Sequence, residues 1–159
     1  MIFATVGTNE APFDRLLHAL ALVHVDEELV VQCGSSDVRP PNARCVDFLP
    51  FDELTAYLQQ SRLAVMHAGV GSIAVALANG VRPIVVPRLH RYREAVDDHQ
   101  LHLAKRLDAI GSVYLVEDPA LLAGSLDRRT EQAPVHLERA GPIVEELRAY
   151  VASVLGEAQ

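Results

Sequence analysis

The stretch LAVMHAGVGS, residues 63–72, decides the fold of this chain. It opens with four apolar residues and ends with two glycines, one residue apart, followed by a serine. A short apolar run that leads into a glycine turn and then a helical pattern is typical of a strand–turn–helix unit in a parallel sheet. We therefore expect a strand over 63–66, a tight turn, and a helix over 72–79.

The same alternation of short apolar runs and longer amphipathic segments extends along the chain. It predicts strands at 2–6, 29–33, 44–48, 63–66, 83–86 and 112–116. It predicts helices at 13–23, 51–60, 72–79 and 96–109, a short helix at 119–126, and a last helix at about 134–155 that packs on the sheet or on a partner. Such alternation favours an α/β fold: a single doubly wound, Rossmann-like parallel sheet with helices on both faces.

Length and composition favour one globular domain over residues 1–159, since half of the residues are hydrophobic and 22% are charged. A net charge of −7 argues against binding nucleic acid through bulk charge. Cys33 and Cys45 lack metal-type spacing, so we expect reduced, buried thiols. No signal-peptide pattern and no apolar run of roughly 18 residues occurs, which favours a cytoplasmic protein that reaches the inner face of a membrane only through a partner.

Doubly wound sheets bind ligands beyond the carboxyl ends of their strands, so the loops that follow the predicted strands are the candidate site. Gly7, Thr8 and Asn9 follow the first strand. Glycine permits close approach of the backbone to a ligand, and the two polar side chains lie near a helix start, where an anion is favoured. A turn or a helix cap explains the same residues equally well.

The turn from His67 to Ser72 is the second candidate. Its two glycines permit exposed backbone amides, and the following helix start favours phosphate. Glycine pairs at such turns also serve packing alone, so both interpretations stand at this point. The turn is neither the dinucleotide-binding fingerprint nor the phosphate loop, and Ser72 lacks the Gly-x-Ser-x-Gly context of a hydrolase nucleophile.

The third candidate follows the strand at 83–86 and contains Arg88, Asp98, His99 and Gln100. Arginine binds diphosphates, and carboxylate and amide groups bind sugar hydroxyls. The alternative is a solvated basic loop before a capped helix. His99 and His102 have a spacing compatible with a metal, but no third ligand lies nearby, so we predict no metal site.

These segments together resemble the donor-binding domain of glycosyltransferase family 28 and its GT-B relatives. The resemblance rests on HAGVGSI at 67–73, NGVRPIVVP at 79–87 and DHQ at 98–100, and it covers about residues 1–107. The opening IFATVGT at 2–8 is similar to that of small stand-alone members, which act in dolichol-linked oligosaccharide and bacterial exopolysaccharide synthesis. The resemblance implies that the domain is one half of a GT-B fold.

The resemblance implies that the glycine turn binds the diphosphate of a uridine-linked sugar, that residues 48–50 contact uracil, and that residues 98–100 face the sugar. Many relatives carry a glutamate for the ribose hydroxyls three residues after the serine, where this chain has Val75. The predicted donor-binding residues are Gly7, Thr8, Asn9, Phe48, Leu49, Pro50, His67, Gly69, Val70, Gly71, Ser72, Arg88, Asp98, His99 and Gln100.

The implied activity is inverting transfer of a sugar from a UDP-sugar to a lipid-linked or polysaccharide acceptor, without a cofactor or an essential metal. Negative charge grows on the departing diphosphate, and the turn with His67 would stabilise it. A one-domain chain lacks the acceptor half that normally supplies the base, so we expect that base on a membrane-anchored partner subunit. The alternative is a non-catalytic nucleotide-sugar-binding or regulatory module.

Overall fold

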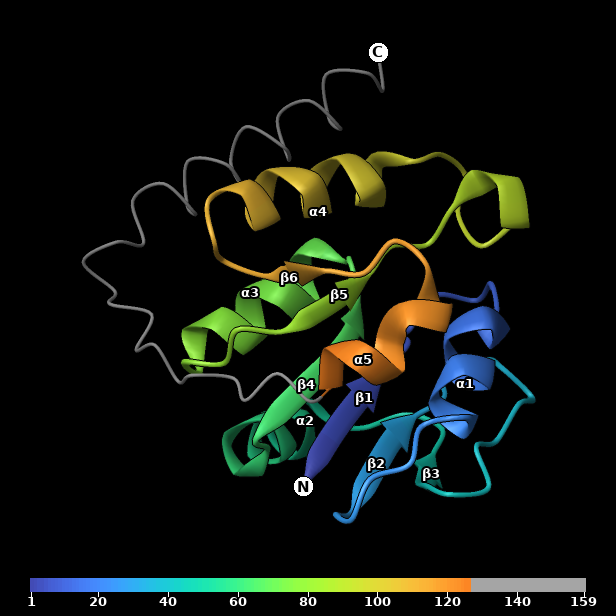
Figure 1. The fold of residues 1–159 in the computed structure, drawn as a ribbon, viewed down its shortest axis with the longest axis vertical. Coiled ribbons are helices and arrows are strands. Elements are labelled where there is room, and N and C mark those ends of the chain that lie inside the picture. Colours follow the sequence, from blue (N-terminus) through green and yellow to red (C-terminus); the bar gives the residue numbers. More distant parts are fainter. Residues whose placement is uncertain (127–159) are drawn as a thin grey trace.

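Six parallel strands form one sheet in the order β3-β2-β1-β4-β5-β6 (Figure 1). The computed structural model describes residues 1–126, so the polar connection and last helix predicted at 127–155 lie outside the described residues. The prediction of a doubly wound α/β sheet is confirmed. The strands are β1 Ile2–Thr5, β2 Leu29–Gln32, β3 Arg44–Val46, β4 Leu63–His67, β5 Ile84–Val86 and β6 Tyr114–Leu115.

A helix follows every strand except β2, in the predicted order. Helix α4 begins at His99 rather than at 96, because the carboxylates of Asp97 and Asp98 accept backbone N–H groups of His99 and His90 and hold the preceding residues in a turn. Two 3₁₀ turns, η1 His90–Tyr92 and η2 Pro119–Leu121, precede α4 and α5. The helices are α1 Asp14–Ala21, α2 Phe51–Gln60, α3 Val70–Ala78, α4 His99–Ala109 and α5 Leu122–Leu126.

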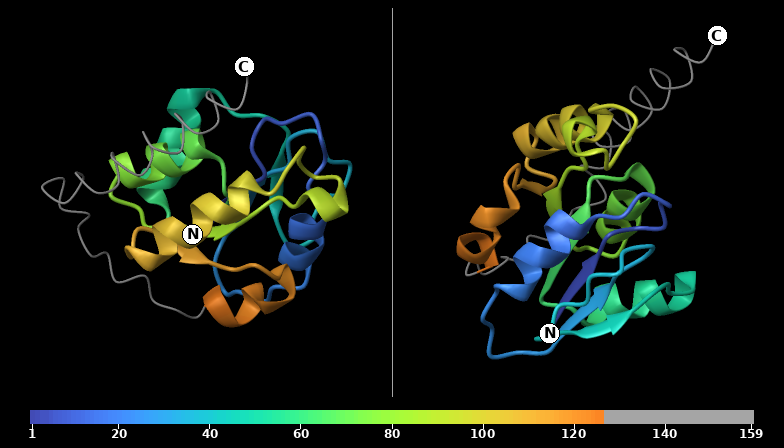
Figure 2. Two further views of the ribbon diagram at one scale, coloured as in Figure 1. Left: turned by 90° about the horizontal axis from the view of Figure 1, so that it is seen from above. Right: turned by 90° about the vertical axis from the view of Figure 1, so that its right-hand side faces the viewer.

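The helices cover both faces of the sheet, and each face has its own core (Figure 2). Successive strand residues point to opposite faces, so β1 contributes Ile2 and Ala4 to one core and Phe3 to the other. The first core is completed by α1 and α5, and the second by α2, α3 and α4. Every residue of β1, β2 and β5 is buried, as expected of parallel strands covered on both sides.

The order of the strands in the sheet reverses between β1 and β4, because β2 and β3 lie on one side of β1 and β4 to β6 lie on the other. These two strands pair in register, with Thr5 opposite Met66, so the loops that follow them leave the sheet side by side. A reversal of this kind opens a crevice at the carboxyl edge, where ligands of doubly wound sheets bind. The fold therefore brings two of the candidate loops together.

Helix α1 offers a matched test of the first core. Leu17 is fully buried, whereas Leu22, just after the helix, is 75% exposed. We expect Leu17→Ala to lower the free energy of unfolding by about 2–5 kcal/mol, because it removes buried methyl groups and leaves a cavity. Leu22→Ala should change it by less than about 0.5 kcal/mol. Urea unfolding followed by circular dichroism measures both, and equal losses would contradict this assignment of the core.

Candidate functional site

The imidazole of His67, the last residue of β4, lies between the backbones of two loops. A Cβ atom on Gly7 or on Gly69 would overlap this ring, so neither position accepts a larger residue unless the ring moves. Gly7 also has a φ of +82°, a conformation that strongly favours glycine. The loop after β2 joins them, because a Cβ on Gly34 would lie 2.8 Å from the carbonyl oxygen of Gly7. Two loops therefore enclose the imidazole, and a third packs against the backbone of Gly7.

His67 is electrically neutral at neutral pH. Burial, followed by the nearby charge of Arg88, lowers the pKa of its imidazole from 6.5 to about 4. Its Nδ1 atom is buried and has no hydrogen-bond partner among residues 1–126. A neutral imidazole takes part in binding through hydrogen bonds rather than through charge.

The glycine turn passes directly into α3, which begins at Val70, two residues earlier than predicted. Gly69 stands at the N-cap position, and no side chain caps the first turn. The first amides of a helix have no intrahelical acceptor, so those of Val70, Gly71 and Ser72 are left for solvent or a ligand. The positive end of the helix dipole lies at the same place.

Gly69 and Gly71 occupy their positions in this turn for different physical reasons. Gly69 is required by the position of His67, which agrees with the packing interpretation. Gly71 is exposed, and a Cβ there would meet no atom within 4 Å in the described part of the chain. Packing within residues 1–126 therefore does not explain glycine at position 71.

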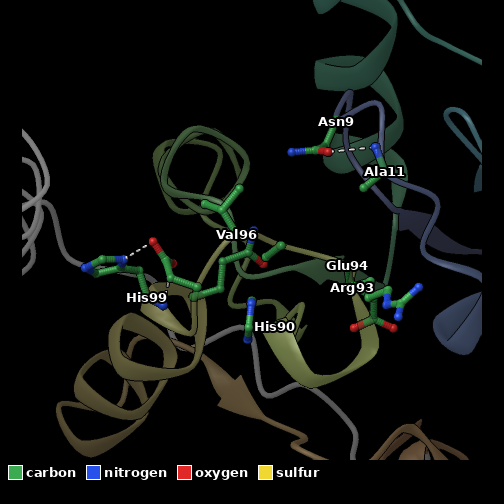
Figure 3. Close-up of a pocket in the computed structure, with 10 residues that line it drawn as sticks. Asn9, Ala11, His90, Arg93, Glu94, Val96 and His99 are labelled. Atoms are coloured by element: carbon green, nitrogen blue, oxygen red, sulfur yellow. Dashed lines mark hydrogen bonds and ion pairs between the residues drawn. The ribbon is translucent and has the colours of Figure 1, made fainter. Parts of the chain in front are cut away.

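A separate pocket of about 580 Å³ lies between the β1–α1 loop and the β5–α4 loop (Figure 3). Asn9 and Ala11 come from the first loop, and the rest of the lining comes from the second loop and from the first two residues of α4. Of the predicted residues, the pocket brings together Asn9, His99 and Gln100. The remaining lining residues were not among the predicted donor-binding residues, and they are Ala11, His90, Arg93, Glu94, Ala95, Val96 and Asp97.

Two polar residues of this region are held by local hydrogen bonds. Asp98 does not line the pocket, and its carboxylate accepts the backbone N–H of His90 at 2.8 Å. Asp97 forms an ion pair with His99, with 2.6 Å between Oδ2 and Nδ1. The hydrogen bond from the His99 backbone is the main cause that lowers the pKa of Asp97. In this structure Asp98 therefore stabilises the conformation of the β5–α4 loop, which lines the pocket.

Thr8 and residues 48–50, which were also predicted to bind the donor, do not line the pocket. Thr8 is exposed, and the side chain of Asn9 also serves the turn, because its Oδ1 accepts the N–H of Ala11 at 2.8 Å. Residues 48–50 lie between β3 and α2, and Phe48 exposes 53% of its surface while Leu49 packs on the second core. Val75 also packs against that core, so position 75 presents an apolar side chain and no carboxylate.

The prediction that Arg88 meets a diphosphate needs correction. Its side chain is fully buried, and its guanidinium donates to backbone carbonyl groups, including that of Val6 at 2.9 Å. Burial also lowers the pKa of Arg88 to about 10, which still leaves it charged at neutral pH. The guanidinium has no exposed surface to offer a ligand in this structure.

Three other expectations concern features outside the site. Cys33 is buried and Cys45 partly buried, both as free thiols, and burial raises the pKa of Cys33 to about 12. Within residues 1–126, no cluster of histidine, cysteine or acidic side chains has the arrangement of a metal site. No helix in the same range is long and apolar enough to span a membrane.

The lowered pKa of His67 predicts a specific pH dependence of stability. Between pH 6.5 and about 4, the unfolded chain binds a proton at His67 that the folded chain does not, so His67 makes stability fall as the pH falls. We expect urea midpoints of His67→Gln to decline less over this window than those of the unsubstituted protein. His18→Gln, at an exposed position of α1, is the control and should follow the unsubstituted protein. Parallel curves for all three proteins would refute the lowered pKa.

Comparison with known proteins places this geometry in a family. Residues 1–144 match the sequence model of the glycosyltransferase family 28 C-terminal domain. The chain is 35% identical over 127 residues to the UDP-N-acetylglucosamine–N-acetylmuramyl-(pentapeptide) pyrophosphoryl-undecaprenol N-acetylglucosamine transferase of Ralstonia nicotianae, covering 71% of this chain and 33% of that protein. It is 32% identical over 125 residues to the UDP-N-acetylglucosamine transferase subunit ALG13 of Mus musculus, covering 70% of this chain and 10% of that protein.

The fold is also found in solved structures of glycosyltransferases. The glycosyltransferase SnogD from Streptomyces nogalater superposes with a TM-score of 0.60 at 25% identity, over 99% of this chain and 43% of that one. The chain thus spans about a quarter to a third of the length of the first curated relatives it matches, and less than half of this structural neighbour. The match over residues 1–144 and the shared fold show that this chain belongs to the family of glycosyltransferase family 28 C-terminal domains, with the fold of one half of a GT-B glycosyltransferase.

Proposed function

We propose that this chain is the donor-binding subunit of an inverting glycosyltransferase and that the turn from His67 to Ser72 binds the diphosphate of a UDP-sugar. One observation carries the proposal most directly. Gly71 is exposed at the start of α3, and no atom of residues 1–126 requires a glycine there. A phosphate group that approaches the helix amides needs that space free of a side chain.

The chemistry assigned to this turn is stabilisation of the leaving group. Transfer breaks the bond between the anomeric carbon and the diphosphate oxygen, and negative charge develops on the diphosphate. Fixed helix amides offset that charge without reorganising during the reaction. His67 adds a neutral hydrogen-bonding group beside them, and an approaching diphosphate would favour its protonated form.

The pocket between the β1–α1 and β5–α4 loops is proposed to hold the sugar. Its lining includes the amides of Asn9 and Gln100 and the imidazole of His99, groups that donate to and accept from hydroxyls. Phe48, half exposed beyond β3, is proposed to contact the uracil together with Leu49 and Pro50. The ribose has to be bound by a group other than residue 75, since Val75 supplies no carboxylate.

Nucleotide binding by this turn is tested with a leucine at Gly71. We expect calorimetry to detect UDP binding by the unsubstituted chain and at least about tenfold weaker binding by Gly71→Leu, because one hydrogen bond to a charged group is worth about 1.5–3 kcal/mol. The control is Gly124→Leu in α5, where a Cβ also meets no atom of the described residues within 4 Å. Both variants should keep the urea midpoint of the unsubstituted protein.

The outcomes of this titration separate two conclusions. Undetectable UDP binding by the unsubstituted chain would overturn the proposed donor. Equal UDP affinity of Gly71→Leu and the unsubstituted chain would show that the nucleotide binds elsewhere.

We further propose that catalysis needs a partner. One of the relatives is itself described as a transferase subunit. An acceptor-binding half on the partner would supply the general base that removes the acceptor's proton. A membrane-anchored partner would bring a lipid-linked or polysaccharide acceptor to this domain at the cytoplasmic face of the membrane.

Partner dependence is tested by a transfer assay with labelled UDP-N-acetylglucosamine, the nucleotide sugar named for two relatives, and other UDP-hexoses. We expect no transfer to membrane extracts by the isolated chain, and transfer when the protein encoded next to it is co-expressed. The neighbouring protein alone is the control and should be inactive. Transfer by the isolated chain would overturn the partner, and UDP binding without transfer in any combination would favour the non-catalytic module.

A further inference from the structure

Arg88 is the largest fully buried side chain in the described part of the chain. Its guanidinium lies over the ring of Phe13, 4.8 Å from the ring centroid. Burying a charged group costs several kcal/mol, and apolar residues of similar volume often stabilise an interior as well or better. Packing alone therefore does not account for arginine at position 88.

The guanidinium of Arg88 donates hydrogen bonds to both ends of the β1–α1 loop and to its own β5–α4 loop. Nη2 donates to the carbonyl oxygen of Val6, just after β1, at 2.9 Å. Nη1 donates to that of Ala11 in the β1–α1 loop at 2.7 Å and to that of Glu94 in the β5–α4 loop at 3.2 Å. Ala11 and Glu94 line the pocket from different loops (Figure 3), so one guanidinium joins both loops that form it.

A second arginine holds the same glutamate through its carboxylate. Arg15 of α1 donates from Nε at 3.0 Å and from Nη2 at 2.9 Å to the two carboxylate oxygens of Glu94. The carboxylate also accepts the backbone N–H of Leu89 at 3.1 Å. The side chain of Glu94 is 7% exposed, so this forked ion pair is little weakened by solvent.

Arg88 also fixes the orientation of Gln100. The backbone N–H of Arg88 donates to Oε1 of Gln100 at 3.1 Å, which determines which end of the amide is the oxygen. The amide nitrogen of Gln100 donates to no residue within 1–126 and is left to a ligand of the pocket that Gln100 lines.

We propose that Arg88 is a positioning residue of the sugar pocket, which sets the placement of its two loops and the orientation of the Gln100 amide, with Glu94 and Arg15 as its supports. This inference rests on the proposed function only in naming the ligand as a sugar. Arg88 itself does not touch the ligand, since it has no exposed surface.

Replacing Arg88 with lysine tests whether the positive charge or the planar shape of the guanidinium holds the loops. An ammonium keeps the positive charge but carries its donors on one nitrogen, so it does not reach the carbonyl groups of Val6, Ala11 and Glu94 together as the planar guanidinium does. Arg88→Lys should release the two loops while leaving the rest of the sheet intact. Arg91→Lys is the matched control, because Arg91 is exposed in the same loop and contacts the Tyr92 ring.

The first measurement is amide hydrogen exchange of the full chain without ligand. We expect Arg88→Lys to speed exchange about tenfold or more at residues 8–12 and 93–98, with β2 and β3 unchanged and Arg91→Lys like the unsubstituted protein. Unchanged exchange in both loops would overturn the proposal, and so would equal acceleration in β2 and β3, which would indicate general destabilisation.

The second measurement compares UDP with a panel of UDP-hexoses by calorimetry. We expect the unsubstituted chain to bind the best UDP-hexose more tightly than UDP, because the hexose occupies the sugar pocket. Arg88→Lys should reduce the ratio of these two affinities about tenfold. An undiminished ratio would overturn the positioning role. Failure of the unsubstituted chain to bind any of these nucleotides would instead overturn the proposed function, and the exchange data would still decide whether Arg88 holds the loops.

Arg15→Lys keeps the proposal testable where Arg88→Lys does not fold. It removes the fork on Glu94 from a side chain that is 20% exposed and leaves the bonds of Arg88 in place. We expect faster exchange at residues 93–98 and unchanged exchange at residues 8–12. Unchanged exchange in both segments would overturn the proposed role of the Arg15–Glu94 ion pair in holding the loops of the pocket.

Discussion

The close approach of the His67 ring to Gly7 and Gly69 is the constraint on which the carboxyl edge of this sheet depends. Strands β1 and β4 pair in register, so the residues after them meet in a narrow space, and the imidazole fills it. Any Cβ at either glycine would displace the ring or a loop. The ring therefore fixes where the turn begins, and the turn fixes where the first amides of α3 point.

The two parts of the candidate site are built by different means. The turn before α3 is made of backbone, and its anion-binding character follows from the glycines and the helix start alone. The pocket is made of side chains held by contacts distant in sequence, such as Arg15 with Glu94 and Arg88 with Ala11. Change at single loop residues should therefore alter the pocket more readily than the turn.

This difference explains what could be predicted from the sequence. The strands and the turn were predictable, because apolar runs and glycine spacing are local signals. The late start of α4 depends on two aspartate side chains that accept backbone N–H groups across the loop. The burial of Arg88 was not predictable, because its acceptors at Val6 and Ala11 lie more than 70 residues away in the sequence. Nothing in the local pattern around Glu94 marked it as a pocket residue.

The electrostatic environment of the candidate site depends on the nearby charged residues rather than on the net charge of the chain. The chain carries a net charge of −7, which on its own would repel a nucleotide diphosphate. Beside the pocket, however, the Glu94 carboxylate is paired with Arg15, and Arg88 is buried with its guanidinium on backbone carbonyl groups. The field of Arg88 reaches His67, whose pKa it helps to lower. Because buried charge is screened less than surface charge, the buried guanidinium of Arg88 affects its surroundings more strongly than any single charge on the acidic surface does.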